Sequence, residues 1–388
     1  MSSRFDDVSI ERLRRRRTVK WTLYGPEVLA AWVAEMDFDV APPVRAAIVA
    51  AVDREDFGYT EADTSELTLA FTSYLSDAYG WKVSPARVFL VADVLAGIAG
   101  ALDEFAPPGC PVIVPTPAYP PLFEMVELGG RVVVPVPLAA DGGRVSLDVD
   151  AIDAGFRAGA RAVLLCNPQN PTGRAFSVGE LTALARVVDH HGGRVVSDEV
   201  HAPLVYPEAR HTPYASVSDA ASAHTVTVTS ASKAWNLAGL KCAQVVMSNH
   251  DDAAHWRRLP VFKVPGPTPL GIAASTAAFS AGGPWLRELV EYLDGNRRLL
   301  ARVIEAELPG VVYRPPDSTY LAWLDCSALG VADPASMFLR SGHVAVSDGP
   351  PFGAGSEQHV RLNFATSRAV LERIVGAMGA AVRSTGAS

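Results

Sequence analysis

Short apolar runs separated by a helical pattern dominate the middle of the chain. Residues 162–166, 194–199 and 225–229 are rich in Val, Leu and Thr, which is typical of buried β-strands. Between the first two runs, residues 178–191 repeat apolar positions three and four apart. This spacing predicts a helix with one buried face, made by Leu181, Leu184, Ala185 and Val188. The strand–helix–strand order predicts an α/β fold with a mostly parallel sheet covered by helices.

A second and longer helical pattern begins at Pro284, ends at Leu308 and is followed by Pro309-Gly310. Its apolar residues again recur three or four positions apart, which predicts an amphipathic helix. The strand-rich pattern before it and the mixed pattern after it indicate two domains. We expect a large α/β domain over residues 44–282, preceded by an N-terminal arm and followed by an α+β part.

The composition is that of an ordinary globular protein. The chain has 388 residues, of which 49% are hydrophobic and 20% are charged, so it is long enough for one large domain and one smaller domain. A net charge of -8 argues against nucleic acid as a partner. The basic run Arg14–Arg17 is the exception, and without further basic clusters it is interpreted as a solvated surface segment.

Cysteine, histidine and apolar patterns exclude several other classes. The cysteines form no Cys-x-x-Cys pair, so neither a zinc site nor a disulfide framework is predicted, and they are interpreted as buried thiols: Cys110, Cys166, Cys242 and Cys326. His190-His191 indicates a helix end rather than a metal site. The uncharged residues 264–286 include Pro265, Pro267 and Pro269 with several Ser and Gly residues, which argues against a membrane span. The Arg-rich start lacks a following apolar segment, so no signal peptide is expected and the predicted location is the cytoplasm.

Candidate chemistry centres on Lys233. Ser230 and Ser232 lie next to it in sequence, and Lys241 follows eight residues later. A nearby cation lowers the pKa of a lysine and makes it a nucleophile toward carbonyls. Hydroxyls and a cation also suit a phosphate group. Together they suggest pyridoxal 5'-phosphate (PLP), which carries an aldehyde and a phosphate; the alternative is a Ser-rich turn with a surface lysine.

The positions of two other polar residues favour the first interpretation. Asn170 follows the predicted strand 162–166, in a turn rich in Pro and Gly, and Asp198 ends the next strand. Lys233 follows the third strand. Parallel sheets bind ligands beyond the carboxyl ends of their strands, so all three side chains are expected at one edge.

These segments, with others along nearly the whole chain, resemble the fold-type I PLP enzymes of the aspartate aminotransferase superfamily. Within that superfamily the chain looks most like the MalY/PatB group of cystathionine β-lyases. The segments that carry the resemblance are Trp32–Phe38, Phe57–Thr60, Pro117–Pro120, Asn167–Gly173, Ser197–His201, Thr229–Lys241, Thr319–Asp325 and Arg361–Ala365. The resemblance implies fold type I, with a large PLP-binding domain over 44–282. It also implies a small domain built from residues 1–43 together with 283–388.

The resemblance also implies roles in holding the cofactor. Lys233 is the implied attachment point of PLP and the base at the substrate Cα, and Asp198 is the implied partner of the pyridine nitrogen. The further cofactor contacts implied by the family are a ring-stacking Tyr119, Asn170 and His201 near the ring oxygen, and a phosphate site made by Ser230, Ser232, Lys241 and the backbone amides of Val94 and Leu95. Relatives usually have Gly where this chain has Asp93, which is predicted here to be a helix N-cap.

Arg361 and Tyr59 extend the predicted site to the substrate and to a second subunit. Arg361 matches the arginine that binds the substrate α-carboxylate, and Asn170 is expected to lie on the substrate side as well. Tyr59 matches a tyrosine that in the family reaches the phosphate of the neighbouring subunit. The resemblance therefore implies a homodimer with a shared active site and an amino acid as the substrate.

Three classes of function are compatible with these residues. The subgroup motifs favour a PLP-dependent carbon–sulfur β-lyase that cleaves L-cystathionine or a similar sulfur amino acid. Every cofactor residue would serve an aminotransferase equally well, because fold does not settle the reaction. The third class is a non-catalytic protein that keeps the fold to bind a partner. The presence of Lys233, Asp198 and Arg361 argues against this third class.

Overall fold

The computed structural model describes residues 3–141, 144–260 and 262–386. The chain divides into two compact units. The larger unit contains Val40–Gln169 and Arg174–Leu286, and the smaller contains Met1–Asp39, Asn170–Gly173 and Arg287–Ser388. The domain boundaries expected from the sequence, at 43/44 and 282/283, stay a prediction. Those domain ranges also include residues 1–2, 142–143, 261 and 387–388, which lie outside the described residues.

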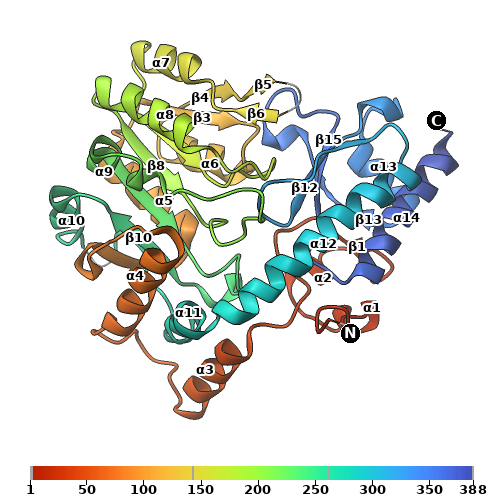
Figure 1. Ribbon diagram of the computed structural model, residues 1–388, viewed down its shortest axis with the longest axis horizontal. Helices are drawn as coiled ribbons and strands as arrows, with labels where there is room; N and C mark the ends of the chain where they lie inside the picture. Colours follow the sequence, from red (N-terminus) through yellow and green to blue (C-terminus); the bar gives the residue numbers. More distant parts are fainter. Residues whose placement is uncertain (1–2, 142–143, 261, 387–388) are drawn as a thin grey trace. The chain divides into compact units, whose positions relative to one another are not determined.

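A seven-stranded sheet forms the centre of the larger unit (Figure 1). Its order is β2-β10-β9-β8-β7-β3-β4, and the pairs from β9 to β4 are parallel. Only β10 runs against its neighbours β9 and β2. The predicted mostly parallel sheet is therefore confirmed. The strands are β2 (Val88–Val91), β3 (Pro111–Thr116), β4 (Val132–Pro137), β7 (Ala162–Cys166), β8 (Arg194–Asp198), β9 (Thr225–Thr229) and β10 (Ala243–Met247).

Helices cover both faces of this sheet because successive strand residues point to opposite sides. Val112, Val114 and Leu164 pack with α5 (Val94–Phe105), α6 (Pro120–Leu128) and α10 (His250–Trp256). Ile113, Val163 and Leu165 pack on the other side with α7 (Val149–Arg157), α8 (Val178–His190) and α9 (Asp219–His224). The four apolar residues predicted to form the buried face of α8 are all buried. The remaining elements are α3 (Pro42–Asp53), α4 (Ser65–Tyr79), α11 (Pro269–Ala281), the hairpin β5 (Ala139–Asp141) and β6 (Arg144–Ser146), and the 3₁₀ turns η1 (Pro85–Arg87), η2 (Tyr214–Ser216) and η3 (Ala238–Leu240).

The smaller unit is built around a four-stranded antiparallel sheet of order β11-β12-β15-β14. A short parallel pair, β1 with β13, joins the N-terminal segment to the C-terminal part. The predicted helix over 284–308 is observed as α12 (Gly283–Glu307). The other elements are α1 (Ile10–Leu13), α2 (Val19–Thr22), β1 (Leu29–Ala30), β11 (Val312–Tyr313), β12 (Leu321–Asp325), η4 (Ser327–Leu329), α13 (Pro334–Gly342), β13 (Val344–Ala345), β14 (Ser347–Asp348), η5 (Pro350–Phe352), β15 (His359–Asn363) and α14 (Arg368–Thr385).

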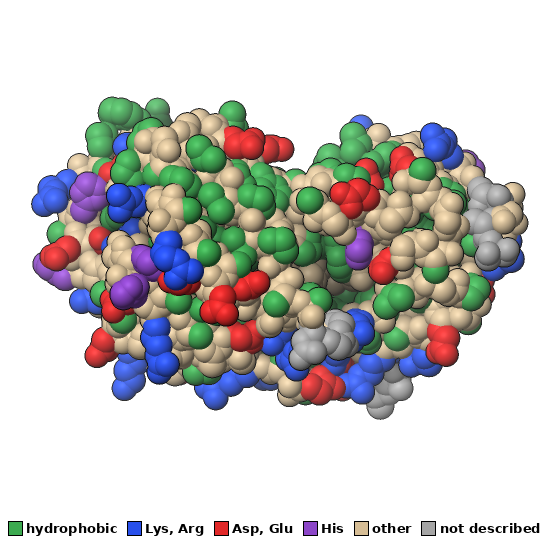
Figure 2. All heavy atoms as spheres, turned by 90° about the horizontal axis from the view of Figure 1, so that it is seen from above, with side chains coloured by type: hydrophobic (Ala, Val, Ile, Leu, Met, Phe, Trp, Pro, Cys, Tyr) green, Lys and Arg blue, Asp and Glu red, His purple; other side chains and the backbone are tan. Residues whose placement is uncertain are grey.

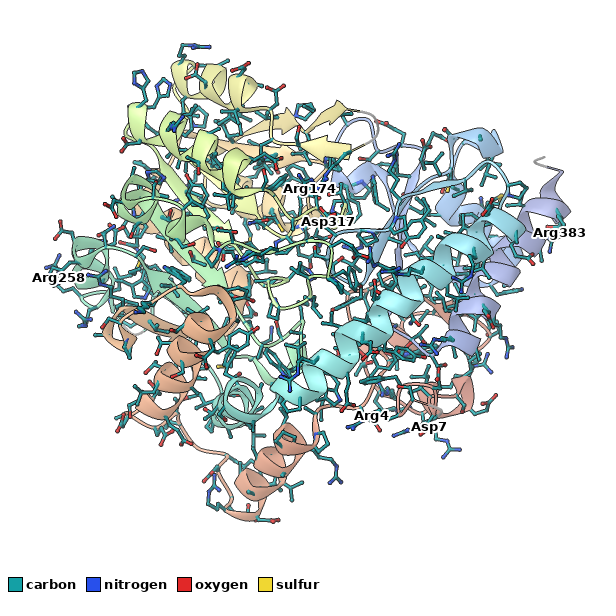
Figure 3. All side chains as sticks on the ribbon, viewed as in Figure 1. Arg4, Asp7, Arg174, Arg258, Asp317 and Arg383 are labelled. Carbon is teal, nitrogen blue, oxygen red and sulfur yellow. The ribbon has the colours of Figure 1, made fainter. Side chains whose placement is uncertain are left out.

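Polar contacts fix the N-terminal segment within the smaller unit. Arg4, labelled in Figure 3, forms an ion pair of 3.0 Å with Glu288 of α12. The Ser367 hydroxyl donates to the Val8 carbonyl at 2.8 Å. Lys20 and Asp37 form a fully buried ion pair at 2.9 Å, and a buried pair needs such close geometry to offset its desolvation. The N-terminal segment is thus part of the folded core of this unit.

The surface shows no single-sign field on the face drawn in Figure 2, where Lys and Arg side chains and Asp and Glu side chains are both spread over the molecule. Within the basic run, Arg14, Arg15 and Arg17 are exposed, and Arg16 pairs with Asp39 at 3.5 Å.

Among the described residues, no helix combines the length and the apolar character needed to cross a membrane.

Candidate active site

Asp198 and Lys233, the two residues predicted to be catalytic, both belong to the larger unit. Asp198 is the last residue of β8 and is only 5% exposed, and its Oδ1 accepts the Val200 N–H at 3.1 Å. Burial raises the pKa of Asp198, while the Val200 N–H and the positive charge of Lys233 oppose this rise, and the result is a pKa of about 6. Lys233 is half-buried in the turn that follows β9. The two predicted catalytic residues are therefore close enough to interact electrostatically.

The register of the parallel strands explains why these residues converge. Cys166 at the end of β7 is aligned with Asp198, and Asp198 is aligned with Val228 near the end of β9. The segments leaving the three strands therefore start from the same edge of the sheet. This edge is where ligands bind in parallel α/β sheets.

A buried network surrounds Glu199, the residue after Asp198, and no motif in the sequence indicated it. Glu199 accepts hydrogen bonds from the Ser197 hydroxyl at 2.8 Å and from the Tyr214 N–H at 2.9 Å. Its second oxygen lies 3.0 Å from Nε2 of His211, and both side chains are almost fully buried. The adjacent acids in Asp198-Glu199 were a visible signal, but the His211 partner is twelve residues away and follows no motif.

The residues predicted to hold a phosphate lie at the neighbouring part of the same edge. The Ser230 hydroxyl donates to the Cys242 carbonyl at 2.7 Å and accepts the Ser232 N–H at 3.0 Å. Lys241 is half exposed, and its Nζ lies 2.7 Å from Oδ2 of Asp93. Asp93 is the N-cap of α5, as predicted, and its Oδ1 accepts the Ala96 N–H at 2.8 Å. Val94 and Leu95 are the first two residues of that helix.

The remaining predicted residues of the larger unit differ in exposure. Tyr119 directly precedes α6 and packs against the hydrophobic core with part of its ring. His201 is 2% exposed and follows β8 by three residues. Tyr59 is fully exposed and lines a surface hollow together with residues of α3 and α11. Tyr59 therefore has no close packing inside its own unit, which distinguishes it from the other predicted site residues.

Arg361 and Asn170 lie together in the smaller unit. Arg361 is on β15 and is 4% exposed, and its Nη1 donates to Oδ1 of Asn170 at 3.0 Å. Its Nη2 donates to the Trp32 carbonyl and to the Ser347 hydroxyl, each at 3.1 Å. The guanidinium also lies 5.1 Å from the ring centre of Phe352. A buried arginine held on several sides is a preorganised binding group for a carboxylate.

Sequence reasoning missed the contacts of Trp32, Ser347 and Phe352 with Arg361. Ser347 also donates from its hydroxyl to the Trp32 carbonyl at 2.6 Å, so the three groups support one another. Ser347 lies on β14, which pairs with β15 directly at Arg361. A two-residue strand has no detectable period in the sequence, so this pairing left no signal.

Other ligating groups are sparse. Among the residues that the structure describes, there is no cluster of three or more His, Cys, Asp or Glu side chains that could hold a metal ion. The four cysteines are free thiols, and only Cys110 is more than slightly exposed.

The fold and these residues define an α/β protein with a lysine–carboxylate site at the edge of a mostly parallel sheet. The model of the aminotransferase class I and II family matches residues 32–378. The chain therefore belongs to the aminotransferase class I and II family.

Individual relatives match over nearly the whole chain. Cystathionine beta-lyase of Corynebacterium glutamicum is 40% identical over 364 residues, covering 94% of this chain and 96% of the relative. A solved chain from Corynebacterium diphtheriae is 42% identical with a TM-score of 0.92, covering 97% of this chain and 98% of that one. The PLP-bound C-S lyase from Staphylococcus hominis is 27% identical with a TM-score of 0.90, covering 97% and 98%. The expected resemblance to the cystathionine β-lyase group is confirmed.

Proposed function

We propose that this protein is a PLP-dependent carbon–sulfur β-lyase that converts L-cystathionine, or a similar sulfur amino acid, to a thiol, pyruvate and ammonia. The observation that carries the proposal is the 40% identity to a cystathionine beta-lyase over nearly the full length of both chains. The buried Asp198 beside Lys233, and the buried Arg361, supply the groups that such a reaction requires. The predicted division into residues 1–43 with 283–388 and residues 44–282 is kept as part of this proposal.

The set of polar residues predicted to contact the cofactor fits PLP. Asp198 is a buried carboxylate next to a cation, and it would hold a proton on the pyridine nitrogen. At the start of α5, the Asp93 carboxylate accepts a hydrogen bond from the Ala96 N–H and pairs with Lys241. The backbone amides of this helix start and Lys241 are therefore suited to an anionic group such as a phosphate. Tyr119, Asn170 and His201 would contact the ring, and Ser230, Ser232, Lys241 and the amides of Val94 and Leu95 would contact the phosphate.

PLP, when bound, supplies an aldehyde for the substrate amine and a ring that accepts the electrons left at Cα. The protein contributes proton transfer through Lys233, whose amine is the base at the substrate Cα. Arg361 would hold the α-carboxylate and so orient the Cα–H bond toward the base. Loss of the Cα proton would let the bond between Cβ and sulfur break, and the sulfur would leave with the bonding electron pair as a thiolate and take up a proton to become the thiol. The remaining three-carbon enamine, once tautomerised to its imine, would be hydrolysed by water to pyruvate and ammonia.

The assembly belongs to the same proposal. Tyr59 is fully exposed in a unit whose other predicted site residues are buried or half-buried, except for Lys241. A large exposed aromatic side chain is typical of a protein interface. We propose that Tyr59 reaches the phosphate site of a second copy in a homodimer. The cytoplasmic location stays a prediction from the sequence.

The cofactor assignment is tested by trapping. We expect the purified protein to be yellow and to lose its absorption band on treatment with borohydride, which fixes PLP on the lysine that carries it. Peptide mapping should then find the adduct on Lys233. Lys241→Ala serves as the matched control and should still give the adduct on Lys233. An adduct on a different lysine would refute the assignment.

A further inference from the structure

The carboxylate of Asp93 lies among the groups that are proposed to bind the phosphate of PLP. Its Oδ1 accepts the Ala96 N–H of α5 at 2.8 Å, and its Oδ2 lies 2.7 Å from Nζ of Lys241. The Leu95 N–H also contributes to lowering the pKa of Asp93. The Asp93 side chain therefore binds both the Ala96 amide in the first turn of α5 and the ammonium group of Lys241.

Strand pairing brings these groups together although they are 148 residues apart in sequence. Val91, near the end of β2, is aligned with Ala243 at the start of β10. Asp93 follows Val91 by two residues and Lys241 precedes Ala243 by two, so the antiparallel pairing sets them opposite each other. The Ser230 hydroxyl donates a hydrogen bond to the carbonyl of Cys242, the residue after Lys241. Ser230 therefore lies close to the same group of residues.

The charge of Asp93 is retained in this environment. Burial raises the pKa of its carboxyl, but the hydrogen bond and charge of Lys241 and the amides of Ala96 and Leu95 outweigh burial, and the pKa lies below its ordinary value. The ion pair is only partly buried, with side-chain exposures of 53% for Lys241 and 35% for Asp93. A phosphate bound here would meet a negative charge and a lysine that is already neutralised.

We propose that Asp93 is an internal competitor for the phosphate of PLP, a role that rests on the proposed PLP-dependent function. When the phosphate of PLP binds, Lys241 and the Leu95 amide must either leave the Asp93 carboxylate or contact the carboxylate and the phosphate together. Asp93 therefore weakens the affinity for phosphate-bearing ligands and makes the cofactor easier to exchange.

The test compares wild-type protein with Asp93→Asn, because Asn caps a helix as well as Asp but carries no charge. PLP is removed from the full-length chain, and the dissociation constants of PLP and of pyridoxal, which lacks the phosphate, are measured by absorbance titration. We expect PLP to bind Asp93→Asn about tenfold more tightly, since a charge pair near a surface contributes on this scale. Pyridoxal should bind both proteins equally. High salt should reduce the difference for PLP because it screens exposed charges.

Several outcomes would overturn the proposal. If PLP binds Asp93→Asn with unchanged affinity, Asp93 does not compete. If PLP binds it more weakly while pyridoxal is unaffected, Asp93 instead positions Lys241 for the phosphate. If pyridoxal tightens as much as PLP, the effect does not act through the phosphate. Asp93→Ser, which also caps the helix, should repeat the result if Asp93→Asn proves unstable. Failure of the wild-type protein to bind PLP at all would contradict the proposed function itself.

Discussion

At the scale of single residues, the buried Asp198 links stability to chemistry. Its pKa is raised from 3.8 to about 6, first of all by burial. A raised pKa in the folded state means that the folded protein binds the proton more tightly than the unfolded chain does. The stability contributed by protonated Asp198 is fully present below pH 3.8 and is lost as the pH rises through about 6. At neutral pH, the ionised Asp198 side chain therefore lowers the stability of the folded protein.

Asp198→Asn should therefore have opposite effects on stability and activity. In protein stripped of PLP, the variant should melt at a higher temperature than wild type at pH 8, and the difference should disappear near pH 4. Its kcat should fall about a hundredfold or more, because the charge that stabilises the reacting ring is lost. Asp219→Asn, at an exposed acid in the first turn of α9, should change neither quantity. Near-normal turnover in Asp198→Asn would refute the assigned role.

The contacts of Arg361 lead to a second prediction at this scale. Ser347→Ala removes one hydrogen bond that orients the guanidinium, which contributes about 0.5–1.5 kcal/mol. We expect KM for L-cystathionine to rise about two- to tenfold with little change in kcat, and Arg361→Lys to raise KM further because a lysine cannot bind in a fork. Ser384→Ala on α14 is the control. If kcat falls while KM stays constant, Ser347 does not act through substrate binding.

At the scale of elements, the sequence predicts long, periodic segments well and short ones poorly. The strands at 162–166 and 225–229 are found with the predicted bounds. Helix α8 ends one residue earlier than predicted, and α12 both begins and ends one residue earlier. For α8, the capping box of Ser177 and Glu180 marks the start of the helix. Two-residue strands such as β14 have no period to detect. Long-range pairing was equally hidden, and so the Asp93–Lys241 and Ser347–Arg361 contacts required the structure.

Helix α5 depends on close approach to the sheet at Gly97. A Cβ at this position would lie 2.7 Å from Val228 Cγ1, which is closer than packed atoms tolerate, and 3.1 Å from Val245 Cγ2, which is a tight contact. Gly97→Ala should therefore push the helix away from the sheet and cost about 1–3 kcal/mol of stability. Because the start of α5 carries the proposed phosphate contacts, the affinity for PLP should fall as well.

Two measurements check this expectation, thermal melting and PLP titration. Gly179→Ala is the matched control, since the only atom near its added Cβ is the Ser177 hydroxyl at 3.9 Å. The control should melt like the wild-type protein and bind PLP normally. A Gly97→Ala protein with unchanged melting and unchanged PLP affinity would show that α5 can shift without consequence.

At the scale of the whole molecule, the sequence contained the fold class and the candidate chemistry, but not the geometry of the site. Asn170, Asp198 and Lys233 were predicted from motifs that follow or end three strands, and those strands, β7, β8 and β9, are parallel and in register. Buried contacts such as that of His211 with Glu199, and that of the Trp32 carbonyl with Arg361, join separate segments and carry no motif. Family membership is shown, whereas the reaction remains a proposal, since lyases and aminotransferases use the same fold.

The most direct test of the central claim is a product assay with L-cystathionine in the absence of any added 2-oxo acid. Pyruvate is followed with lactate dehydrogenase and NADH, and ammonia and homocysteine are measured in the same samples. We predict equal amounts of the three products, with Lys233→Ala as the inactive control. If no pyruvate forms, yet amino groups pass readily to an added 2-oxo acid, the protein is an aminotransferase and the lyase account is wrong.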